Sequence, residues 1–410
     1  MNLRALSVQR IYLTLLFGNT LAASFIWGIN TLFLLDAGLT NFEAFLANAF
    51  FTAGMVLFEV PTGVIADGWG RRTSYLLGTV TLAVSTLLYF VLWQIHAPFI
   101  AWAAASALLG LGFTFFSGAV EAWLVDAMQF VGFKGELESV FGKGQIVSGI
   151  AMLGGSVAGG AIAQLTNLGV PYIVRAIILG LLFITAFVAM RDLGFSPDKT
   201  EKPLAAMKTI ARSSIKYGLR QPSVRWIMLA APFTASVGFY VFYALQPYLL
   251  ELYGDEKAYG IAGLAAAIVA AAQIAGGLLA AKIRGLFKMR TSALVAVLLA
   301  TIVTVLALGA IAQFWAAIVL MMIWGLLFAA GMPIRQAYLN SHIPSKQRAT
   351  VLSFDSMIGN TGGIVLQPVL GRVADISSYG QSFIVGGLVQ IIAVPMLIRS
   401  KKYDTPKRQL

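Results

Sequence analysis

Twelve predominantly apolar stretches of about 20 residues run through the chain, each long enough to cross ~30 Å of bilayer hydrocarbon as a helix. The chain as a whole agrees, since 59% of its residues are hydrophobic, 11% are charged and the mean hydropathy is +0.82. Such usage lies far outside that of soluble globular proteins. The sequence therefore predicts an all-α integral membrane protein with twelve transmembrane helices at 11–35, 44–66, 73–93, 98–125, 140–165, 170–190, 226–250, 258–281, 291–311, 314–338, 350–374 and 380–398.

A short glycine-led pattern recurs at the ends of four of these segments. Gly63-Val-Ile-Ala-Asp67 has echoes at 160–164, 277–281 and 371–375, at intervals of 97, 117 and 94 residues. Such spacing indicates an internal repeat of about 100 residues, which holds three membrane helices. Because three is an odd number, consecutive repeats have opposite orientation in the membrane. The sequence predicts two six-helix halves, each made of two inverted three-helix repeats, an arrangement typical of secondary transporters.

The basic residues indicate how the chain is oriented, because short cytoplasmic loops collect Lys and Arg. With both termini inside, 26 of the 29 Lys and Arg residues fall on the cytoplasmic side, and only Arg175, Lys257 and Arg372 fall outside. Topology thus explains the net charge of +12, and no nucleic-acid partner is needed to explain it. We expect a multi-pass protein of the plasma membrane, as in a prokaryotic inner membrane, with both termini cytoplasmic.

The longest polar stretch separates the two expected halves, so the predicted domains are 1–191, a cytoplasmic linker at 192–225, and 226–410. Within the linker, Lys208, Arg212, Lys216 and Arg220 recur every four residues, while apolar residues between 204 and 219 follow helical spacing. This pattern predicts an amphipathic basic helix. Two interpretations stay open: a helix that lies on anionic headgroups, and a solvated helix without lipid contact.

Residues suited to enzyme chemistry are scarce. The chain has no cysteine, and its two histidines, His96 and His342, are far apart in sequence. We find no cluster with catalytic or metal-ligand spacing, and therefore expect no metal, no cofactor and no enzymatic activity. A receptor or scaffold would need a sizeable soluble domain, and no polar stretch of the chain exceeds the linker.

The loop after the second segment carries a specific motif. Gly63, Asp67, Gly70, Arg71 and Arg72 match the signature loop of the major facilitator superfamily, and the chain resembles this family over all twelve segments. The match is incomplete, because Gly68 stands where the family usually has a basic residue. Within this family, the motifs of the chain most resemble those of the twelve-helix members that exchange drugs for protons.

The resemblance implies that this loop stabilises the outward-open state of a transporter. In physical terms, Gly63 would allow close helix approach, Asp67 would cap the turn or the next helix, and Gly70 would relieve the backbone. Arg71 would pair with an acid at a neighbouring helix end, for which Asp126 is the candidate. The alternative is that Arg71 and Arg72 serve only as topology anchors.

The fifth segment carries a weaker match. Its Gly155-Ser-Val-Ala-Gly159-Gly160 resembles the glycine motif of antiporter members of the family, with Ser156 in place of proline. Glycine-rich faces also serve tight packing in membrane helices of any function, so the motif favours export only modestly. The fourth segment lacks the mid-membrane arginine of many proton-coupled drug exporters, which argues against a simple transfer of their mechanism.

Three carboxylates within the segments are candidates for proton coupling: Glu59, Glu121 and Asp355. Glu59 lies eight residues before Asp67, hence ~12 Å deeper in the membrane. Glu59 is the first choice, with the alternative that it is a structural carboxylate bonded to a helix end or to a cation. Arg335 could hold an anionic substrate or neutralise one of these carboxylates, and we favour neutralisation.

Polar and aromatic side chains on the first, fourth, seventh and tenth segments are candidates for a substrate cavity, because the resemblance places these segments around one. In the repeat frame, Glu59 corresponds to Ser156, Gln273 and Gln367, which adds polar groups at one depth. Any single aromatic residue here could instead serve helix packing. The candidates are Asn19, Trp27, Asn30, Phe113, Phe116, Tyr240, Tyr243, Gln246, Gln273, Trp324, Phe328, Arg335 and Gln367.

An aromatic cavity with few charges suits amphipathic or hydrophobic small molecules better than sugars or phosphorylated metabolites. The sequence therefore predicts a monomeric secondary transporter that works by alternating access, with protons as the coupling ion, and that exports such compounds, drugs among them. The alternative is a symporter or facilitator for a nutrient, a metabolite or a lipid-like substrate.

Overall fold

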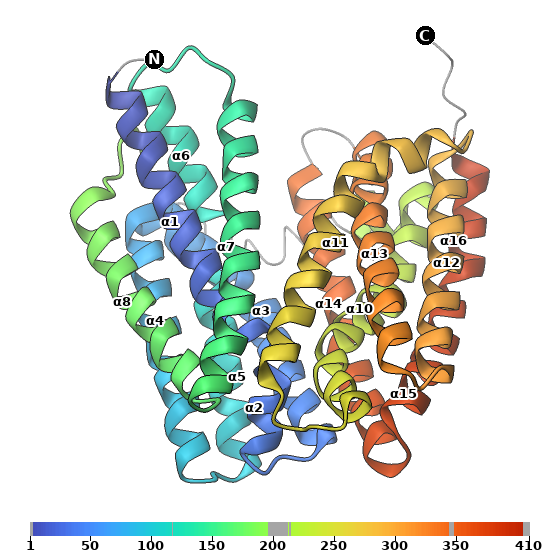
Figure 1. The fold of residues 1–410 in the computed structure, drawn as a ribbon. Coiled ribbons are helices and arrows are strands. Elements are labelled where there is room, and N and C mark those ends of the chain that lie inside the picture. Colours follow the sequence, from blue (N-terminus) through green and yellow to red (C-terminus); the bar gives the residue numbers. More distant parts are fainter. Residues whose placement is uncertain (1–2, 117, 196–211, 213–214, 344–347, 405–410) are drawn as a thin grey trace. The chain divides into compact units, whose positions relative to one another are not determined.

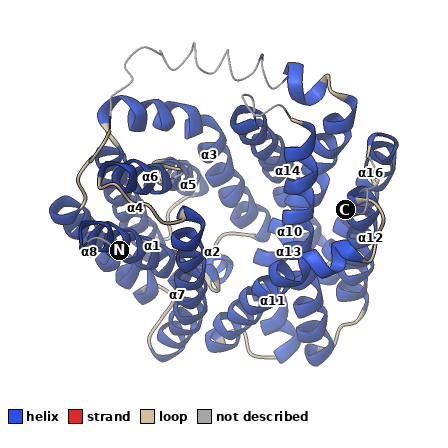
Figure 2. Cartoon of the chain, turned by 90° about the horizontal axis from the view of Figure 1, so that it is seen from above, coloured by secondary structure: helices blue, strands red, loops and turns tan. Residues whose placement is uncertain are grey.

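Helices account for nearly the whole computed structural model, which describes residues 3–116, 118–195, 212, 215–343 and 348–404. Figure 2 contains only helices and loops in this described part. Ten helices are long and apolar enough to cross a membrane, and an eleventh span arises when α1 (Leu3–Trp27) and α2 (Asn30–Asp36), bent by 47°, are taken together. The remaining predicted segment corresponds to α14 (Arg348–Ile376), a helix of 29 residues.

Every predicted segment is confirmed as helix, with most ends within five residues of the prediction, although the first helix begins at Leu3 rather than at residue 11. Two of them, 98–125 and 380–398, are split in the structure, as is the first. The remaining helices are α3 (Asn41–Trp69), α4 (Arg71–Gln94), α5 (Phe99–Thr114), α6 (Ala119–Phe130), α7 (Leu137–Leu165), α8 (Val170–Ala189), α10 (Pro222–Tyr253), α11 (Tyr259–Gly285), α12 (Arg290–Ala310), α13 (Phe314–His342), α15 (Tyr379–Ile391) and α16 (Ala393–Ser400).

The predicted linker helix at 204–219 lies for the most part outside the described residues. Within that range the structure describes residue 212 and a five-residue π-helix, η1 (Ile215–Leu219). The arrangement of two six-helix halves, each with two inverted three-helix repeats, agrees with the helix order of Figure 1.

The chain divides into two compact units. The first unit contains Met1–Gly38, Phe50–Ala206 and Ala258–Ala267. Within it, α1 packs along α7 and α8, and α4 packs along α5 and α8. Helix α7 approaches its neighbours closely: a Cβ atom at Gly160 would lie 2.6 Å from the Cα of Gly263, a distance that no real Cβ tolerates. The predicted tight packing of this glycine-rich helix is therefore present.

The second unit contains Leu39–Ala49, Met207–Lys257 and Ile268–Leu410. Helix α10 packs along α14 and α16, and α12 packs along α13 and α15. A buried apolar cluster joins the ends of these helices, with Tyr338 at its centre, whose hydroxyl donates to the carbonyl of Ser223 at 3.1 Å. Asp404, just after the short 3-10 helix η3 (Lys401–Tyr403), accepts hydrogen bonds from the backbone N–H and the hydroxyl of Thr291, so it caps α12.

Candidate functional site

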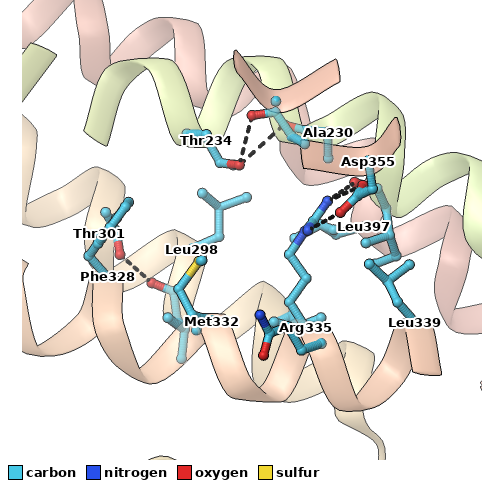
Figure 3. A pocket seen from close by; sticks show the side chains of 18 of the residues that line it. Ala230, Thr234, Leu298, Thr301, Phe328, Met332, Arg335, Leu339, Asp355 and Leu397 are labelled. Carbon is cyan, nitrogen blue, oxygen red and sulfur yellow. Dashed lines mark hydrogen bonds and ion pairs between the residues drawn. The ribbon is translucent and has the colours of Figure 1, made fainter. Parts of the chain in front are cut away.

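A cavity of about 330 Å³ lies inside the second unit, between α10, α12, α13 and α14, with contributions from α15 and α16 (Figure 3). Its walls are mainly aliphatic and aromatic, and a smaller set of polar groups faces it. The larger apolar side chains are Ile227, Phe239, Leu294, Val297, Leu298, Leu327, Phe328, Met332, Leu339, Leu352 and Leu397. The polar side chains are Thr234, Thr301, Arg335, Gln336, Asp355, Ser356, Asn360 and Gln390.

An ion pair between Arg335 of α13 and Asp355 of α14 forms part of the cavity wall. Both guanidinium nitrogens take part: Nη1 donates to Oδ2 and Nη2 donates to Oδ1 of Asp355, each at 2.6 Å. Nη2 also lies 3.4 Å from the carbonyl of Ile227. Such a two-point pair is among the stronger charge-assisted contacts in proteins. The pairing agrees with the interpretation of Arg335 as a charge neutraliser, and Asp355 is the carboxylate that it neutralises.

The pair is largely removed from solvent. The side chain of Asp355 is 6% exposed and that of Arg335 is 23% exposed. In Figure 3 both side chains reach toward one another from facing helices, beside Leu339 and Leu397. Burial of this kind makes each charge dependent on the other, since a lone charge in an apolar wall costs several kcal/mol. Protonation of Asp355 would thus leave the charge of Arg335 without its partner.

Two threonines line the cavity with hydroxyls that already donate to their own helix. The hydroxyl of Thr234 lies 3.3 Å from the carbonyls of Ala230 and Ala231, and that of Thr301 donates to the carbonyl of Val297 at 2.8 Å. Since each proton is engaged, these oxygens offer lone pairs as acceptors. They could take a hydrogen bond from a bound molecule without losing one of their own.

Only two of the predicted cavity residues in the second unit, Phe328 and Arg335, line this cavity. Tyr240 and Trp324 are 0% and 1% exposed and belong to the core, which corrects their prediction as cavity residues. The hydroxyl of Tyr240 donates to Ser382, and Trp324 stacks on Phe328 at 5.5 Å between ring centroids. Trp324 therefore supports a wall residue from behind.

Four further predicted residues of the second unit lie outside the cavity. Gln246 and Gln367 are buried in the helix packing, at 4% and 1% exposure, while Tyr243 and Gln273 are partly buried. The ring of Tyr243 contacts that of Phe242 edge-on. None of these four residues lines the cavity described here, and their assignment to a cavity formed by segments of both halves stays a prediction.

In the first unit, the signature loop has a geometry that differs in part from the prediction. Arg71 pairs with Asp67, four residues before it, at 2.6 Å, rather than with Asp126. A Cβ atom at Gly63 would meet nothing within 4 Å in the described structure, so Gly63 does not mark a close helix approach there. The first correction has a local cause, since Asp67 lies four residues before Arg71 and satisfies its charge within the loop.

The cap of α4 comes from a residue that the sequence analysis missed. Asp192, three residues after the end of α8, accepts a hydrogen bond from the backbone N–H of Arg72 at 2.9 Å. The guanidinium of Arg72 donates to the carbonyl of Phe187 at 2.6 Å. Burial raises the pKa of the Asp192 carboxyl above its ordinary value, and the N–H and charge of Arg72 offset part of this rise. Arg72 therefore has structural partners besides its role in topology.

Gly70 is required where Asp192 approaches. Its φ of 105° lies in the region that side chains rarely adopt, and a Cβ atom there would collide with the carboxylate of Asp192. This geometry agrees with the prediction that Gly70 relieves the backbone. Asp67, by contrast, does not cap α4; Asp192 does.

The two other coupling candidates lie in the first unit. Glu59 sits on α3 with a partly buried side chain, on the same helical face as Gly63 and Asp67. Glu121 lies in the first turn of α6, and its side chain is exposed. Neither lies at the cavity of the second unit, so Asp355 is the candidate carboxylate with a described ligand-sized space beside it.

The predicted aromatic and polar residues of the first unit are spread over several contacts. Asn30 is buried and accepts a hydrogen bond from the hydroxyl of Tyr172 at 3.1 Å. Phe116 packs edge-on against Tyr75 at 4.7 Å between centroids. Asn30 and Phe116 thus serve packing, whereas Asn19 and Trp27 are partly buried on α1.

Arg175, which the sequence analysis assigned to the outer side of the membrane, is a buried cation. Its side chain on α8 is only 2% exposed, with its guanidinium 5.8 Å from the ring centroid of Phe113. The available signal was its position five residues inside an apolar segment that begins at 170. A buried cation in a membrane helix usually marks a functional or structural pairing.

Comparison with known proteins agrees with the fold and adds a family. The model of the Major Facilitator Superfamily matches residues 12–364 and 262–410. The uncharacterized MFS-type transporter YxaM of Bacillus subtilis (strain 168) is 26% identical over 239 residues, which is 56% of this chain and 55% of that protein. The chain thus spans about half the length of this curated relative.

Solved structures resemble the whole chain at low identity. The nucleoside transporter NupG, in the form of a point mutant, superposes with a TM-score of 0.76 at 12% identity, covering 97% of this chain and 99% of NupG. A bacterial homolog of the human lysosomal transporter Spinster gives 0.75 at 14% identity, covering 98% of both chains. At such identities the likeness concerns the fold alone.

Proposed function

The chain belongs to the Major Facilitator Superfamily, and from this premise we propose that it is a secondary active transporter that exports small amphipathic or hydrophobic compounds, such as drugs, in exchange for protons. The observation that carries the proposal is the cavity of the second unit, which combines apolar walls with one buried carboxylate–guanidinium pair. We further propose alternating access between the halves 1–191 and 226–410, joined by the linker at 192–225, in a monomer.

The walls of the cavity support the substrate class. Its volume of about 330 Å³ lies at the small end of the range for ligand pockets. Phe328, Leu298 and Met332 offer apolar contact, and the acceptor oxygens of Thr234 and Thr301 offer a few directed hydrogen bonds. A sugar or a phosphorylated metabolite would leave most of its polar groups unpaired against such walls.

The ion pair supports the coupling. With Asp355 ionised, the pair has no net charge; with Asp355 protonated, Arg335 contributes an uncompensated positive charge to the wall. A cationic compound in the cavity would favour the first state and a proton the second, because like charges repel strongly where water is excluded. Competition of this kind exchanges a lipophilic cation for a proton. Glu59 and Glu121 stay as further coupling candidates.

The alternative is symport or facilitated diffusion of a nutrient, a metabolite or a lipid-like compound, and one observation favours it. The same ion pair would work in the opposite sense with an anionic substrate, because protonation of Asp355 frees Arg335 to bind an anion. Two structural neighbours are a nucleoside transporter and a bacterial homolog of the human lysosomal transporter Spinster.

The test is transport of ethidium, a lipophilic cation, in proteoliposomes with an imposed pH gradient. We expect the wild type to move ethidium against the proton gradient, Asp355→Asn to lose this movement, and Glu256→Gln, a matched exposed carboxylate outside the cavity, to retain it. Glu59→Gln and Glu121→Gln in the same assay test the two other coupling candidates. No gradient-driven movement in any of these proteins would contradict cation export, and proton-stimulated uptake of an anion would establish the alternative.

The same vesicles test the membrane orientation. We propose a prokaryotic plasma membrane with both termini cytoplasmic, on the basis of the basic residues that collect on one side. Export in cells requires this orientation, which protease protection of a C-terminal tag reports.

A further inference from the structure

Two arginines of the second unit face one tryptophan ring. The guanidinium carbon of Arg225 and that of Arg399 each lie 4.8 Å from the ring centroid of Trp226. Arg225 and Trp226 belong to the first turns of α10, and Arg399 to the last turn of α16, which packs along α10. Since both distances end at one centroid, the two guanidinium carbons are at most about 10 Å apart.

No described carboxylate neutralises this pair of cations. The ion pairs among the described residues join Asp67 to Arg71 and Asp355 to Arg335. The carboxylate of Asp404, on the segment that follows α16, is engaged by Thr291. The buried Nε of Arg225 also has no hydrogen-bond partner in the described structure. The cluster therefore holds two positive charges that an anion would offset.

The surroundings of the cluster favour a lipid over a free anion. Ile398, directly before Arg399, is 52% exposed, and Ile391 and Ile392, about two turns earlier in the chain, are 46% and 45% exposed. Exposed isoleucines on a membrane helix suit acyl chains, and tryptophan is enriched where hydrocarbon meets headgroups. Lys401 and Lys402, both exposed, follow in the next turn and add positive charge.

We propose that Arg225, Trp226 and Arg399 bind the headgroup phosphate of an anionic phospholipid, whose acyl chains lie along the exposed isoleucines of α15 and α16. The two planar guanidinium groups can bind phosphate oxygens through paired N–H donors, which lysine cannot do. Basic pockets beside membrane helices are suited to such headgroups. This site is separate from the transport cavity and does not depend on the proposed substrate.

Trp226 itself provides the readout. The full-length protein is reconstituted in vesicles of phosphatidylcholine with a minor share of phosphatidylglycerol, and bromine atoms, which quench tryptophan on contact, are placed on the chains of one lipid or the other. Because the chain has eight tryptophans, the Trp226→Phe variant is measured in parallel and its quenching is subtracted. We expect brominated phosphatidylglycerol to quench Trp226 severalfold more than an equal amount of brominated phosphatidylcholine.

The matched variants separate a binding site from general attraction. Arg225→Gln/Arg399→Gln should abolish the preference, and Arg225→Lys/Arg399→Lys, which retains the charge, should reduce it severalfold. Equal quenching by the two lipids overturns the proposal, as does a lysine variant that keeps the full preference, since bulk charge alone would then explain the result. Loss of the preference on addition of inorganic phosphate would likewise overturn the lipid assignment in favour of a free anion.

Discussion

Asp67 and Arg71 of the first unit form an ion pair within one turn of chain, and Asp67 is 53% exposed. Arg335 and Asp355 of the second unit join two helices, and Asp355 is only 6% exposed. Exposed ion pairs contribute little to stability, because water screens the attraction between their two charges. In a buried ion pair each charge depends on its partner, because a change in the protonation of one residue leaves the other charge buried without compensation. The comparison indicates that protonation has larger structural consequences in the second unit than in the first.

The units also differ in how their helices run. In the first unit, α1 gives way to α2 with a bend of 47°, and α5 gives way to α6 near Gly118, whose φ is 69°. In the second unit, α10 and α13 run without interruption for 32 and 29 residues, although both contain proline. In each unit an aspartate nevertheless caps a helix that comes earlier in the chain: Asp192 caps α4 and Asp404 caps α12.

The largest expected effect comes from breaking the buried pair. Asp355→Ala should lower the free energy of unfolding by about 3–5 kcal/mol, because Arg335 then lies in the cavity wall without its partner. The measurement is thermal or denaturant unfolding in detergent. The double variant Arg335→Met/Asp355→Leu should recover most of the loss, since it removes both charges. A loss below about 1 kcal/mol for Asp355→Ala would contradict this prediction, because an exposed ion pair contributes that little.

A smaller effect is expected at the signature loop of the first unit. Gly70→Ala should cost about 1–3 kcal/mol, because it strains a backbone at positive φ and displaces Asp192. Gly63→Ala is the matched control on the preceding helix, where a Cβ meets nothing, and alanine there should be neutral or stabilise by about 0.5–1 kcal/mol. Equal destabilisation by the two substitutions would contradict the described loop geometry.

The helix cap of the second unit should contribute more to the free energy of unfolding than the cap of the first unit, in the same order as the two ion pairs. Asp404→Ala removes two hydrogen bonds to Thr291, which is fully buried, and should cost about 1–2 kcal/mol. Asp192→Ala removes a cap from a half-exposed site and should cost about 0.5–1 kcal/mol. Unfolding of both variants under one condition gives the order. A larger loss at Asp192 would reverse this part of the comparison.

The pH dependence of Asp192 is a further, smaller effect. Its pKa is raised in the folded protein, so the stability that the protonated form contributes is present below the ordinary pKa of about 4 and is lost as the pH rises through the raised value. The melting temperature of the wild type should therefore fall relative to Asp192→Asn as the pH rises through this window. A constant difference between the two proteins would exclude a raised pKa.

The smallest effect on stability is expected at the exposed pair. Asp67→Asn should change the free energy of unfolding by less than about 1 kcal/mol. Its effect on transport is a separate matter, because the signature loop is expected to stabilise the outward-open state relative to other conformations. Unchanged transport by Asp67→Asn at normal expression would exclude this role and leave Arg71 as a topology anchor.

The sequence was sufficient for the helices and for one contact of the site. The length of each apolar stretch predicts a membrane span. The Arg335–Asp355 pair could be inferred because a cation and a carboxylate 20 residues apart fall on consecutive predicted helices. The helix caps formed by Asp192 and Asp404 could not be predicted from the sequence, since each residue bonds to a helix more than 100 residues away in the chain. Tyr240 and Trp324 were placed wrongly because an aromatic side chain suits a core and a cavity wall equally.

The most direct measurement counts protons released when tetraphenylphosphonium binds to the purified protein in weakly buffered detergent solution, over a series of pH values. The account predicts release of up to one proton for each bound cation in the wild type and in Glu256→Gln, and none in Asp355→Asn. Binding without proton release in the wild type, or equal release from Asp355→Asn, would contradict the claim that Asp355 exchanges a proton for the transported compound.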